Sequence, residues 1–267
     1  MRRGQVVHPG LPNLKNLVLI RETRQWNGGG GFMNSASVLI LFGPPGSGKG
    51  TQAARLASIL GVPAISTGEI LRTECQSGSL LGQELTAMLS SGQLVSDGLV
   101  SEVVARRLQN ADCASGCILD GYPRTVSQAR FLDDLLMKLD IAGPTVLDFA
   151  ISQREVITRL ERRRQCARCA RIFSVDTGSR NPLVCELDGA PLIRRADDHP
   201  GAIRERLRLY KQNASELARY YRGQNYHRIR ADRPSDEVTT QIFSALKLNQ
   251  RTKMPQTRGA LAPRAAY

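Results

Sequence analysis

The sequence predicts an α/β fold in which helices flank a parallel sheet and a small lobe is inserted. Three stretches read as an apolar strand, a turn and a helix: "SVLILFGPPGSGKGTQAARLASILG", "CILDGYPRTVSQARFLDDLLMKL" and "PTVLDFAISQREVITRLERRR". Strands that alternate with helices favour a parallel sheet with crossover connections. Between residues 166 and 195, cysteines, Gly and Pro interrupt this rhythm, which predicts the inserted lobe.

Helix boundaries are legible at several points of the chain. Ser66 and Ser152 each stand three residues before a glutamate, the spacing of a capping box that starts a helix. Gly61 is suited to end the first helix, because glycine tolerates the left-handed conformation common there. After the inserted lobe, the pattern predicts helices at about 200–221 and 235–247, with a short strand in "YHRIR" between them.

The composition is that of a globular protein with an unusual charge. Of the 267 residues, 41% are hydrophobic, which suffices for a full-sized core without disulfides. The net charge of +13 predicts polyanionic partners: nucleic acid, a phospholipid surface or phosphorylated metabolites. The excess is concentrated, since residues 1–32 and 249–267 each carry +4 and residues 162–195 carry +5.

Signals for a membrane or for export are weak. No apolar run approaches the roughly 18–20 residues that span a bilayer. The N-terminal "LVLI" is too short for the apolar centre of a secretory signal, so we expect a cytoplasmic protein. Residues 1–34 are expected to be a disordered extension, a transit peptide or the result of a misassigned start, because Met33 stands just before the first strand.

A glycine-rich loop, Gly43-x4-Gly48-Lys49, follows the strand "LILF" and precedes a helix. Such loops turn backbone N–H groups toward phosphate oxygens, the helix N-terminus adds its positive dipole end, and the lysine reaches the terminal phosphates. Gly50 takes the place of the Ser or Thr of the general pattern. The predicted ATP-binding residues of the loop are Gly46, Ser47, Gly48, Lys49, Gly50 and Thr51.

Six motifs together resemble adenylate kinase, a family of P-loop nucleoside monophosphate kinases. They are "GPPGSGKGTQ", "ISTGEILR", "GQLVSD", "LDGYPRT", the Arg-rich helix and "RRADD", in the order and approximate spacing of that family. The resemblance implies a P-loop NTPase-type sheet in residues 35–248, a helical monophosphate-binding lobe at 66–95 and a zinc-binding lid at 162–198. It leaves the basic tail at 249–267 unexplained. It also implies a monomer that transfers a phosphoryl group reversibly from ATP to AMP with Mg²⁺, giving two ADP.

The resemblance assigns most of the acceptor site. Thr67 is implied to contact the adenine of AMP and Arg72 its phosphate, although Thr67 is also placed to cap a helix. Met88 and Val95 are implied to form the apolar wall of the adenine pocket, and Gln93 stands where many relatives carry lysine. The other implied AMP residues are Gly121, Arg124, Gln128, Arg195 and Arg206.

Asp120 ends an apolar strand, at the edge where ligands gather in open α/β sheets, and can hold Mg²⁺ through water. The alternative, from position alone, is a carboxylate that caps the next turn. Arg124 offers a bidentate fork for a phosphate, and Gln128 an amide for the adenine edge.

Cations rather than a general base are expected to promote the reaction. An acceptor phosphate is already ionised near neutral pH, and His199 and His227 have no nucleophile nearby in sequence. Arg159 and Arg163 are four residues apart, which predicts one shared helical face, and Arg159 is implied to stack on the adenine of ATP. The arginines match the phosphate-clamping arginines of the family, and the catalytic set that the resemblance implies is Lys49, Asp120, Arg124, Arg159, Arg163, Arg195 and Arg206. Four other arginines are expected to be solvated charges: Arg162, Arg164, Arg204 and Arg208.

Two ligand pairs, Cys166-x2-Cys169 and Cys185-x2-Asp188, stand beside turn residues. Three thiolates and a carboxylate suit tetrahedral Zn²⁺, and the spacing is that of a structural site. The alternative is a disulfide or a redox-active pair, which a reducing compartment disfavours. The remaining cysteines are expected to be packing residues: Cys75, Cys113 and Cys117.

Two other functions stay open at this point. A kinase for UMP, CMP or GMP, or one that prefers GTP as donor, would carry the same loop, while Thr67 and Gln128 favour AMP. A zinc-ribbon protein that binds nucleic acid would explain the charge and the cysteines, but aromatic residues are only 5% and the basic residues follow the nucleotide motifs. We therefore expect ATP, AMP and ADP as partners, and neither nucleic acid nor a membrane.

Overall fold

A computed structural model describes residues 37–76, 80–91, 95–175 and 184–248. All of them belong to one of the two units into which the chain divides, residues 31–267. The predicted extension 1–34 and tail 249–267 lie outside the described residues, as does Gln93.

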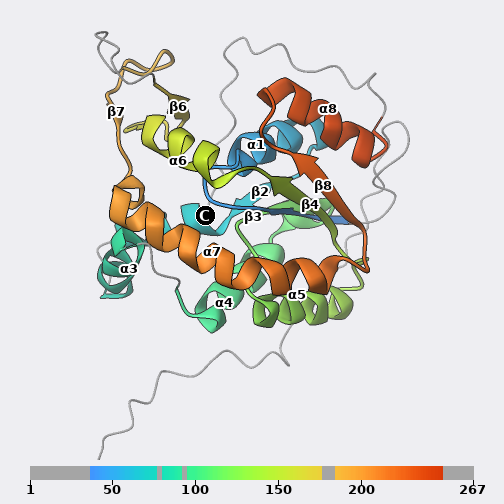
Figure 1. Cartoon of the computed structure of the whole chain (residues 1–267). Helices are drawn as coiled ribbons and strands as arrows, with labels where there is room; N and C mark the ends of the chain where they lie inside the picture. Colours follow the sequence, from blue (N-terminus) through green and yellow to red (C-terminus); the bar gives the residue numbers. More distant parts are fainter. Residues whose placement is uncertain (1–36, 77–79, 92–94, 176–183, 249–267) are drawn as a thin grey trace, which may run out of the picture. The chain divides into compact units, whose positions relative to one another are not determined.

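Five strands form the central sheet (Figure 1): β1 Ser37–Phe42, β2 Ala64–Ser66, β3 Gly116–Asp120, β4 Thr145–Ala150 and β8 Tyr226–Arg230. Their order is β2-β3-β1-β4-β8, and every neighbouring pair is parallel. β1 lies in the middle, where Leu41 is in register with Asp120 of β3 and Leu147 of β4. The predicted parallel α/β sheet is confirmed, and it places the glycine-rich loop beside the end of β3.

Helices cover both faces of this sheet (Figure 1): α1 Lys49–Leu60, α2 Thr67–Gln76, α3 Leu80–Ser91, α4 Asp97–Leu108, α5 Val126–Lys138, α6 Gln153–Arg162, α7 Pro200–Tyr221 and α8 Ser235–Ala245. Side chains alternate along β1, as a strand requires. Leu39 and Leu41 pack in a core with α1 and α8, whereas Val38 and Ile40 pack in a core with α4, α5 and α7. Both faces of the sheet are therefore buried.

The predicted helix boundaries are largely confirmed. Ser66 Oγ accepts from the N–H of Glu69 (3.4 Å), and Ser152 Oγ accepts from the N–H of Glu155 (3.2 Å). The carboxylate of Glu155 accepts from Arg159 Nε (2.9 Å) on the next turn. Gly61 ends α1 in the left-handed conformation, with φ of 67°, and donates its N–H to the Ala57 carbonyl.

The inserted lobe holds three short antiparallel strands, β5 Arg163–Cys166, β6 Ile172–Ser174 and β7 Leu192–Ile193, in the order β6-β5-β7. The prediction that Arg159 and Arg163 share a helical face is wrong. α6 ends at Arg162, and Arg163 has extended φ and ψ of −66° and 132° because it already pairs with Ser174 across β5 and β6. The backbone changes from helix to strand between the two arginines, so they do not share a helical face.

The cysteines outside the lobe pack as expected. Cys113 and Cys117 are buried in the main core, and Cys75 is half-buried against it. Among the described residues, no helix combines the length and the hydropathy needed to cross a bilayer.

Candidate active site

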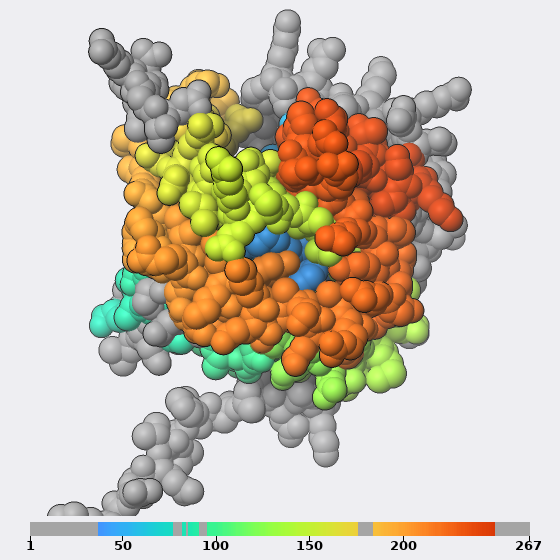
Figure 2. Space-filling view, viewed as in Figure 1, coloured from blue at the N-terminus to red at the C-terminus, as the bar shows by residue number. Residues whose placement is uncertain are grey.

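The glycine-rich loop joins β1 to α1, and Figure 2 shows blue atoms of this first described part of the chain at the base of a hollow between α6 and α7. Lys49 is the first residue of α1. Its ammonium group donates hydrogen bonds to the carbonyl oxygens of Gly43 (2.8 Å) and Pro44 (2.7 Å). Desolvation lowers the pKa of Lys49 to about 8, which the neighbouring Asp120 opposes. Arg124, Arg206 and Arg163 act in the same direction as desolvation and contribute to this lowered pKa, so all four side chains lie within electrostatic reach of the ammonium.

The other predicted loop residues flank Lys49 in the sequence: Gly46, Ser47, Gly48, Gly50 and Thr51. Ser47 is the most buried of these five residues. The departure at Gly50 from the general pattern has a local reason. A Cβ atom at this position would lie 3.3 Å from Asp120 Oδ2. A serine or threonine would crowd the carboxylate that ends β3, and glycine avoids this contact.

Thr67 and Arg124 meet at the backbone of Gly121. Thr67 Oγ1 donates to the Gly121 carbonyl (3.1 Å), and Arg124 Nε donates to the same oxygen (2.8 Å). Gly121 has a φ of 81°, and an added Cβ would lie 3.1 Å from Arg124 Nη2. Glycine is thus required both by the conformation and by the approach of the guanidinium.

Gln128 adjoins this group from the first turn of α5. Its side chain is buried, and its Oε1 accepts from the backbone N–H of Arg124 (2.7 Å). Arg124 still reaches solvent, yet the surrounding protein lowers its pKa, mainly by desolvation. The structure therefore brings together Thr67, Gly121, Arg124 and Gln128, as the sequence predicts.

Three further predicted arginines gather around a turn, η3 (Ala196–Asp198). Arg195 donates to Asp197 through Nε and Nη2 (2.9 and 2.7 Å). Arg206 Nη1 lies 3.0 Å from Asp197 Oδ2 and 3.3 Å from Asp198 Oδ1. Arg163 Nε donates to Asp198 (2.7 Å). Residues from β5, η3 and α7 thus share two carboxylates.

The charge of this arginine cluster is only partly compensated. Desolvation and, to a smaller extent, the nearby Arg195 lower the pKa of Arg72 to about 10. Desolvation likewise lowers the pKa of Arg206 to about 10. Desolvation alone would raise the pKa of Asp197, but Arg206 and Arg195 outweigh it and hold that pKa well below its usual range. An arriving anion would relieve the repulsion among these cations.

Comparison with known proteins agrees with this geometry. A family model described as "Adenylate kinase" matches residues 41–226. Relatives of that name occur in Anaeromyxobacter dehalogenans (strain 2CP-1 / ATCC BAA-258), 42% identical over 189 residues, and in Archaeoglobus fulgidus, 40% identical over 185 residues. These matches cover 69% of this chain and 87% and 85% of the relatives. A relative of that name from Thermosipho melanesiensis is 40% identical over 190 residues, or 70% of this chain and 88% of that relative.

This chain belongs to the adenylate kinase family. It is accordingly a nucleoside monophosphate kinase, a phosphotransferase, and the family implies ATP, AMP and ADP as substrates. The matched span contains every predicted nucleotide and metal residue, from Gly46 to Arg206.

The sequence prediction did not name Asp197 and Asp198 as part of the arginine cluster. Asp198 is fully buried, and Arg194 Nε also donates to its carbonyl oxygen (2.9 Å). The sequence did offer a signal for these two residues. They are adjacent acids that follow two arginines in a strongly basic segment, and buried cations need anionic partners.

The other predicted nucleotide-binding residues lie on α6, on α3 and before α4. Arg159 is half-buried on α6, where it pairs with Glu155. Val95 is buried in the main core beside α4, and Met88 is half-buried on α3. Arg204 and Arg208 are exposed as expected, whereas two arginines expected to be solvated are half-buried: Arg162 and Arg164. Arg164 is held at the carbonyls of Glu161 and Arg163.

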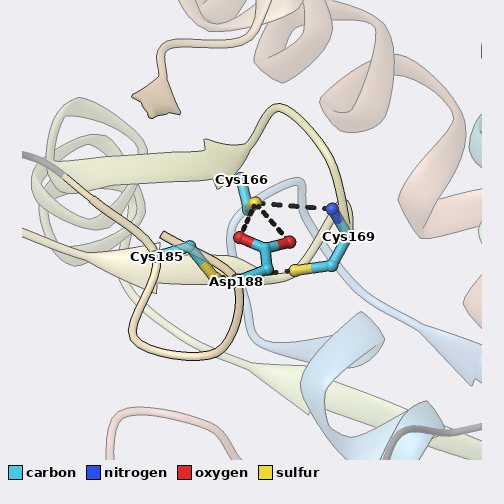
Figure 3. Close-up of side chains that lie close together, drawn as sticks. All are labelled: Cys166, Cys169, Cys185 and Asp188. Carbon is cyan, nitrogen blue, oxygen red and sulfur yellow. Dashed lines mark hydrogen bonds between the residues drawn. The ribbon is translucent and has the colours of Figure 1, made fainter. Parts of the chain in front are cut away.

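The predicted metal ligands converge in the lobe (Figure 3). The ligand atoms of Cys166, Cys169, Cys185 and Asp188 all lie within 4.8 Å of one another. Cys166 Sγ contacts both Asp188 carboxylate oxygens (3.3 and 3.5 Å), and the sulfurs of Cys169 and Cys185 are 3.7 Å apart. Three sulfurs and one carboxylate suit tetrahedral coordination, so the residues present can hold a metal ion.

Backbone geometry favours the same interpretation. The N–H groups of Arg168 and Cys169 donate to Cys166 Sγ (3.3 and 3.4 Å). Desolvation would raise the pKa of Cys166, but these donors outweigh it and lower that pKa. Donation of this kind stabilises the thiolate, which is the form that binds metal.

Proposed function

We propose that this chain catalyses the reversible transfer of the γ-phosphoryl group of ATP to AMP, giving two ADP. The observation that carries the proposal is the electrostatic reach between Lys49 of the loop, Asp120 of β3 and Arg124, Arg163 and Arg206. These residues come from α1, β3, the turn before α5, β5 and α7, and Asp120 is the last residue of β3 at the carboxyl edge of the sheet. A donor loop and an acceptor site at one edge are what a phosphoryl transfer between two nucleotides requires.

The donor half of the site is proposed to hold MgATP. The loop N–H groups would cradle its phosphates, and the Lys49 ammonium would leave the carbonyls of Gly43 and Pro44 to contact the terminal phosphates. Asp120 would hold Mg²⁺ through water, and when bound this ion neutralises charge on the transferring phosphates. Arg159 would cover the adenine of ATP.

The acceptor half is proposed to hold AMP. Arg72 and Arg124 would bind its phosphate, and Thr67 and Gln128 its base. The backbone of Gly121, together with Met88 and Val95, would border the adenine. Because the acceptor phosphate is already ionised, the bond from the γ-phosphorus to ADP breaks and the bond to AMP forms without a general base.

The arginine cluster is proposed to stabilise the transition state. Transfer spreads negative charge over the equatorial oxygens of the γ-phosphoryl group. Arg163, Arg195 and Arg206 already sit within one network around Asp197 and Asp198, so little reorganisation is needed when this charge develops.

Two lobes are proposed to close over the substrates. Residues 66–95 would carry the AMP side and residues 162–198 the lid, within a kinase domain of residues 35–248. Zn²⁺ held by Cys166, Cys169, Cys185 and Asp188 would bind the loops of the lid together. Closure would exclude water and so suppress hydrolysis of ATP.

Further parts of the proposal concern the setting of the enzyme. We propose a monomer in the cytoplasm that acts on small nucleotides and binds neither nucleic acid nor membranes. Three arginines of the basic lid segment, Arg163, Arg194 and Arg195, lie in the network around η3.

A coupled assay across nucleotides tests the proposal. With MgATP as donor, kcat/KM should be at least about a hundredfold higher for AMP than for UMP, CMP or GMP, because a site that hydrogen-bonds one base edge leaves polar groups unpaired with another. A higher value for another monophosphate would reassign the enzyme within the family. Salt-dependent binding to a random oligonucleotide that a bisubstrate dinucleotide does not displace would instead support the nucleic-acid alternative.

A further inference from the structure

Asp97 has no role in the site as described so far, yet it touches a residue that is proposed to read the base. It is the first residue of α4. Its Oδ1 accepts from Gln128 Nε2 (2.8 Å), and its Oδ2 accepts from the hydroxyl of Thr125 (2.6 Å). These contacts tie the start of α4 to the start of α5 on the side that carries Arg124.

The two hydrogen bonds of the Gln128 side chain fix the positions of the oxygen end and the NH2 end of its amide. A carboxylate can only accept, so Asp97 requires the NH2 end of the amide. The backbone N–H of Arg124 can only donate, so it requires the oxygen end (2.7 Å). Exchanging the two ends would set donor against donor and acceptor against acceptor in a side chain that is only 4% exposed.

Asp97 is itself fixed as an acceptor. Thr125 is the N-cap of α5, and its hydroxyl oxygen accepts from the N–H of Gln128 (3.2 Å). Because the Asp97 carboxylate can only accept, the single proton of this hydroxyl points to Asp97. In the hydrogen bonds that join Asp97, Thr125 and Gln128, the donor and the acceptor are therefore each determined.

The bonds within the protein leave the Gln128 amide with one N–H and one lone pair. Adenine offers a matching edge, with an amino donor at N6 and an acceptor at N1. Hypoxanthine and guanine offer the reverse order, an acceptor at O6 and a donor at N1. An amide can pair with either edge, and the positions of its oxygen end and its NH2 end decide which of the two edges it matches.

We propose that Asp97 is a positioning residue that sets the base specificity, because it fixes the Gln128 amide in the orientation that pairs with adenine and opposes a 6-oxopurine. This inference rests on the proposed function, in which Gln128 faces the base of the acceptor nucleotide. Asp97 acts through Gln128 and contacts no substrate.

The test compares AMP with IMP as acceptors in the wild-type chain and in Asp97→Asn. Asparagine has nearly the same shape, but its side chain can present either an oxygen or an NH2 group to Gln128, so one of the two constraints on the amide disappears. We expect the ratio of kcat/KM for AMP to that for IMP to fall about tenfold, which corresponds to about 1.4 kcal/mol. The Arg124 N–H retains the other constraint, so the preference should not vanish.

Matched variants separate specificity from structure. Glu102→Gln removes one negative charge from the same helix, where Glu102 pairs with Arg106, and should leave the ratio unchanged. Asp97→Glu keeps a group that only accepts and should preserve most of the ratio. If a melting curve shows that Asp97→Asn does not fold, Asp97→Ser serves in its place, because a hydroxyl can donate or accept and so cannot fix the amide.

The outcomes distinguish this inference from the proposed function. A wild-type chain that does not phosphorylate AMP overturns the proposed function before any variant is made. A wild-type chain that is active with AMP but uses IMP equally well overturns the role of Asp97. An unchanged ratio in a folded Asp97→Asn protein, or an equal fall in Glu102→Gln, overturns it as well.

Discussion

The end of the central sheet and the lid hold their functional side chains in different ways. Behind the nucleotide site, side chains such as Leu119 and Leu132 are fully buried in cores that span strands and helices. Among the described residues of the lid, the buried hydrophobic cluster consists of Cys166, Cys185 and Ala190. Of the five exposed large hydrophobics among the described residues, four lie in or beside its strands: Ile172, Val184, Leu187 and Ile193.

This difference shows which kind of support each region needs. The sheet can position charged groups because apolar burial stabilises it independently of them. The lid leaves most of its large apolar residues exposed, and the four converging residues of the proposed metal site would take the place of a core when a metal is bound. Substituting a functional side chain at the end of the sheet should therefore leave the fold intact. Substituting a metal-binding side chain in the lid should instead unfold the lid.

The largest expected effect is on catalysis at the sheet. Arg124→Ala removes a guanidinium held at the Gly121 carbonyl and should lower kcat/KM for AMP by roughly a thousandfold or more. The melting temperature should change little, because the side chain reaches solvent and lies outside both cores. Steady-state kinetics and a melting curve check this, and near-normal rates would remove the basis for the AMP assignment.

The same substitution in the two regions sharpens the comparison. Leu132→Ala, in a fully buried position of α5, should cost about 2–5 kcal/mol of unfolding free energy. Leu187→Ala, where the side chain is 48% exposed in the lid, should cost about 0.5 kcal/mol or less. Urea denaturation measures both, and equal costs would show that the lid has a core of its own.

Removal of a metal ligand should affect the lid alone. Cys185→Ser should reduce bound zinc from about one per chain to a small fraction and lower the midpoint of lid unfolding by about 5 °C or more. Cys75→Ser, at a half-buried cysteine outside the cluster, is the control and should retain the metal. Metal analysis and hydrogen exchange measure the effect, and full zinc in Cys185→Ser would contradict the assigned ligand set.

The smallest expected effect is a pH dependence at the phosphate loop. The free-state pKa of Lys49 is about 8, and an anion binds its protonated form more tightly. The Kd for MgATP should therefore rise almost twofold between pH 7 and 8 and then by up to about tenfold per pH unit. Calorimetry measures this slope. Lys49→Arg keeps its charge and should show no rise, so identical slopes in the two proteins would argue against titration of Lys49.

Much of the fold followed from local signals in the sequence. Gly61 and Ser152 mark helix ends through their own backbone geometry or hydrogen bonds, so neighbouring residues suffice to predict them. The phosphate loop and the four metal ligands follow from spacing, because each motif brings its own atoms together. The ranges of the predicted helices and of the strand in "YHRIR" agree with α7, α8 and β8.

Contacts between distant segments were harder to predict. The spacing of Arg159 and Arg163 suggested one helical face, but strand pairing with Ser174 ends the helix between them. Asp97 and Gln128 are 31 positions apart and meet because α4 and α5 begin side by side. No local pattern distinguishes such an aspartate from an ordinary residue at the start of a helix.

The central claim is that the γ-phosphoryl group passes from ATP to AMP at this site. The most direct measurement incubates the chain with Mg²⁺, ATP labelled in its γ-phosphate and unlabelled AMP, and follows the label. Our account predicts that the label appears in the β-phosphate of ADP, with two ADP formed per AMP consumed and little labelled inorganic phosphate. Label that appears as inorganic phosphate, or remains in ATP while AMP is unchanged, would contradict it.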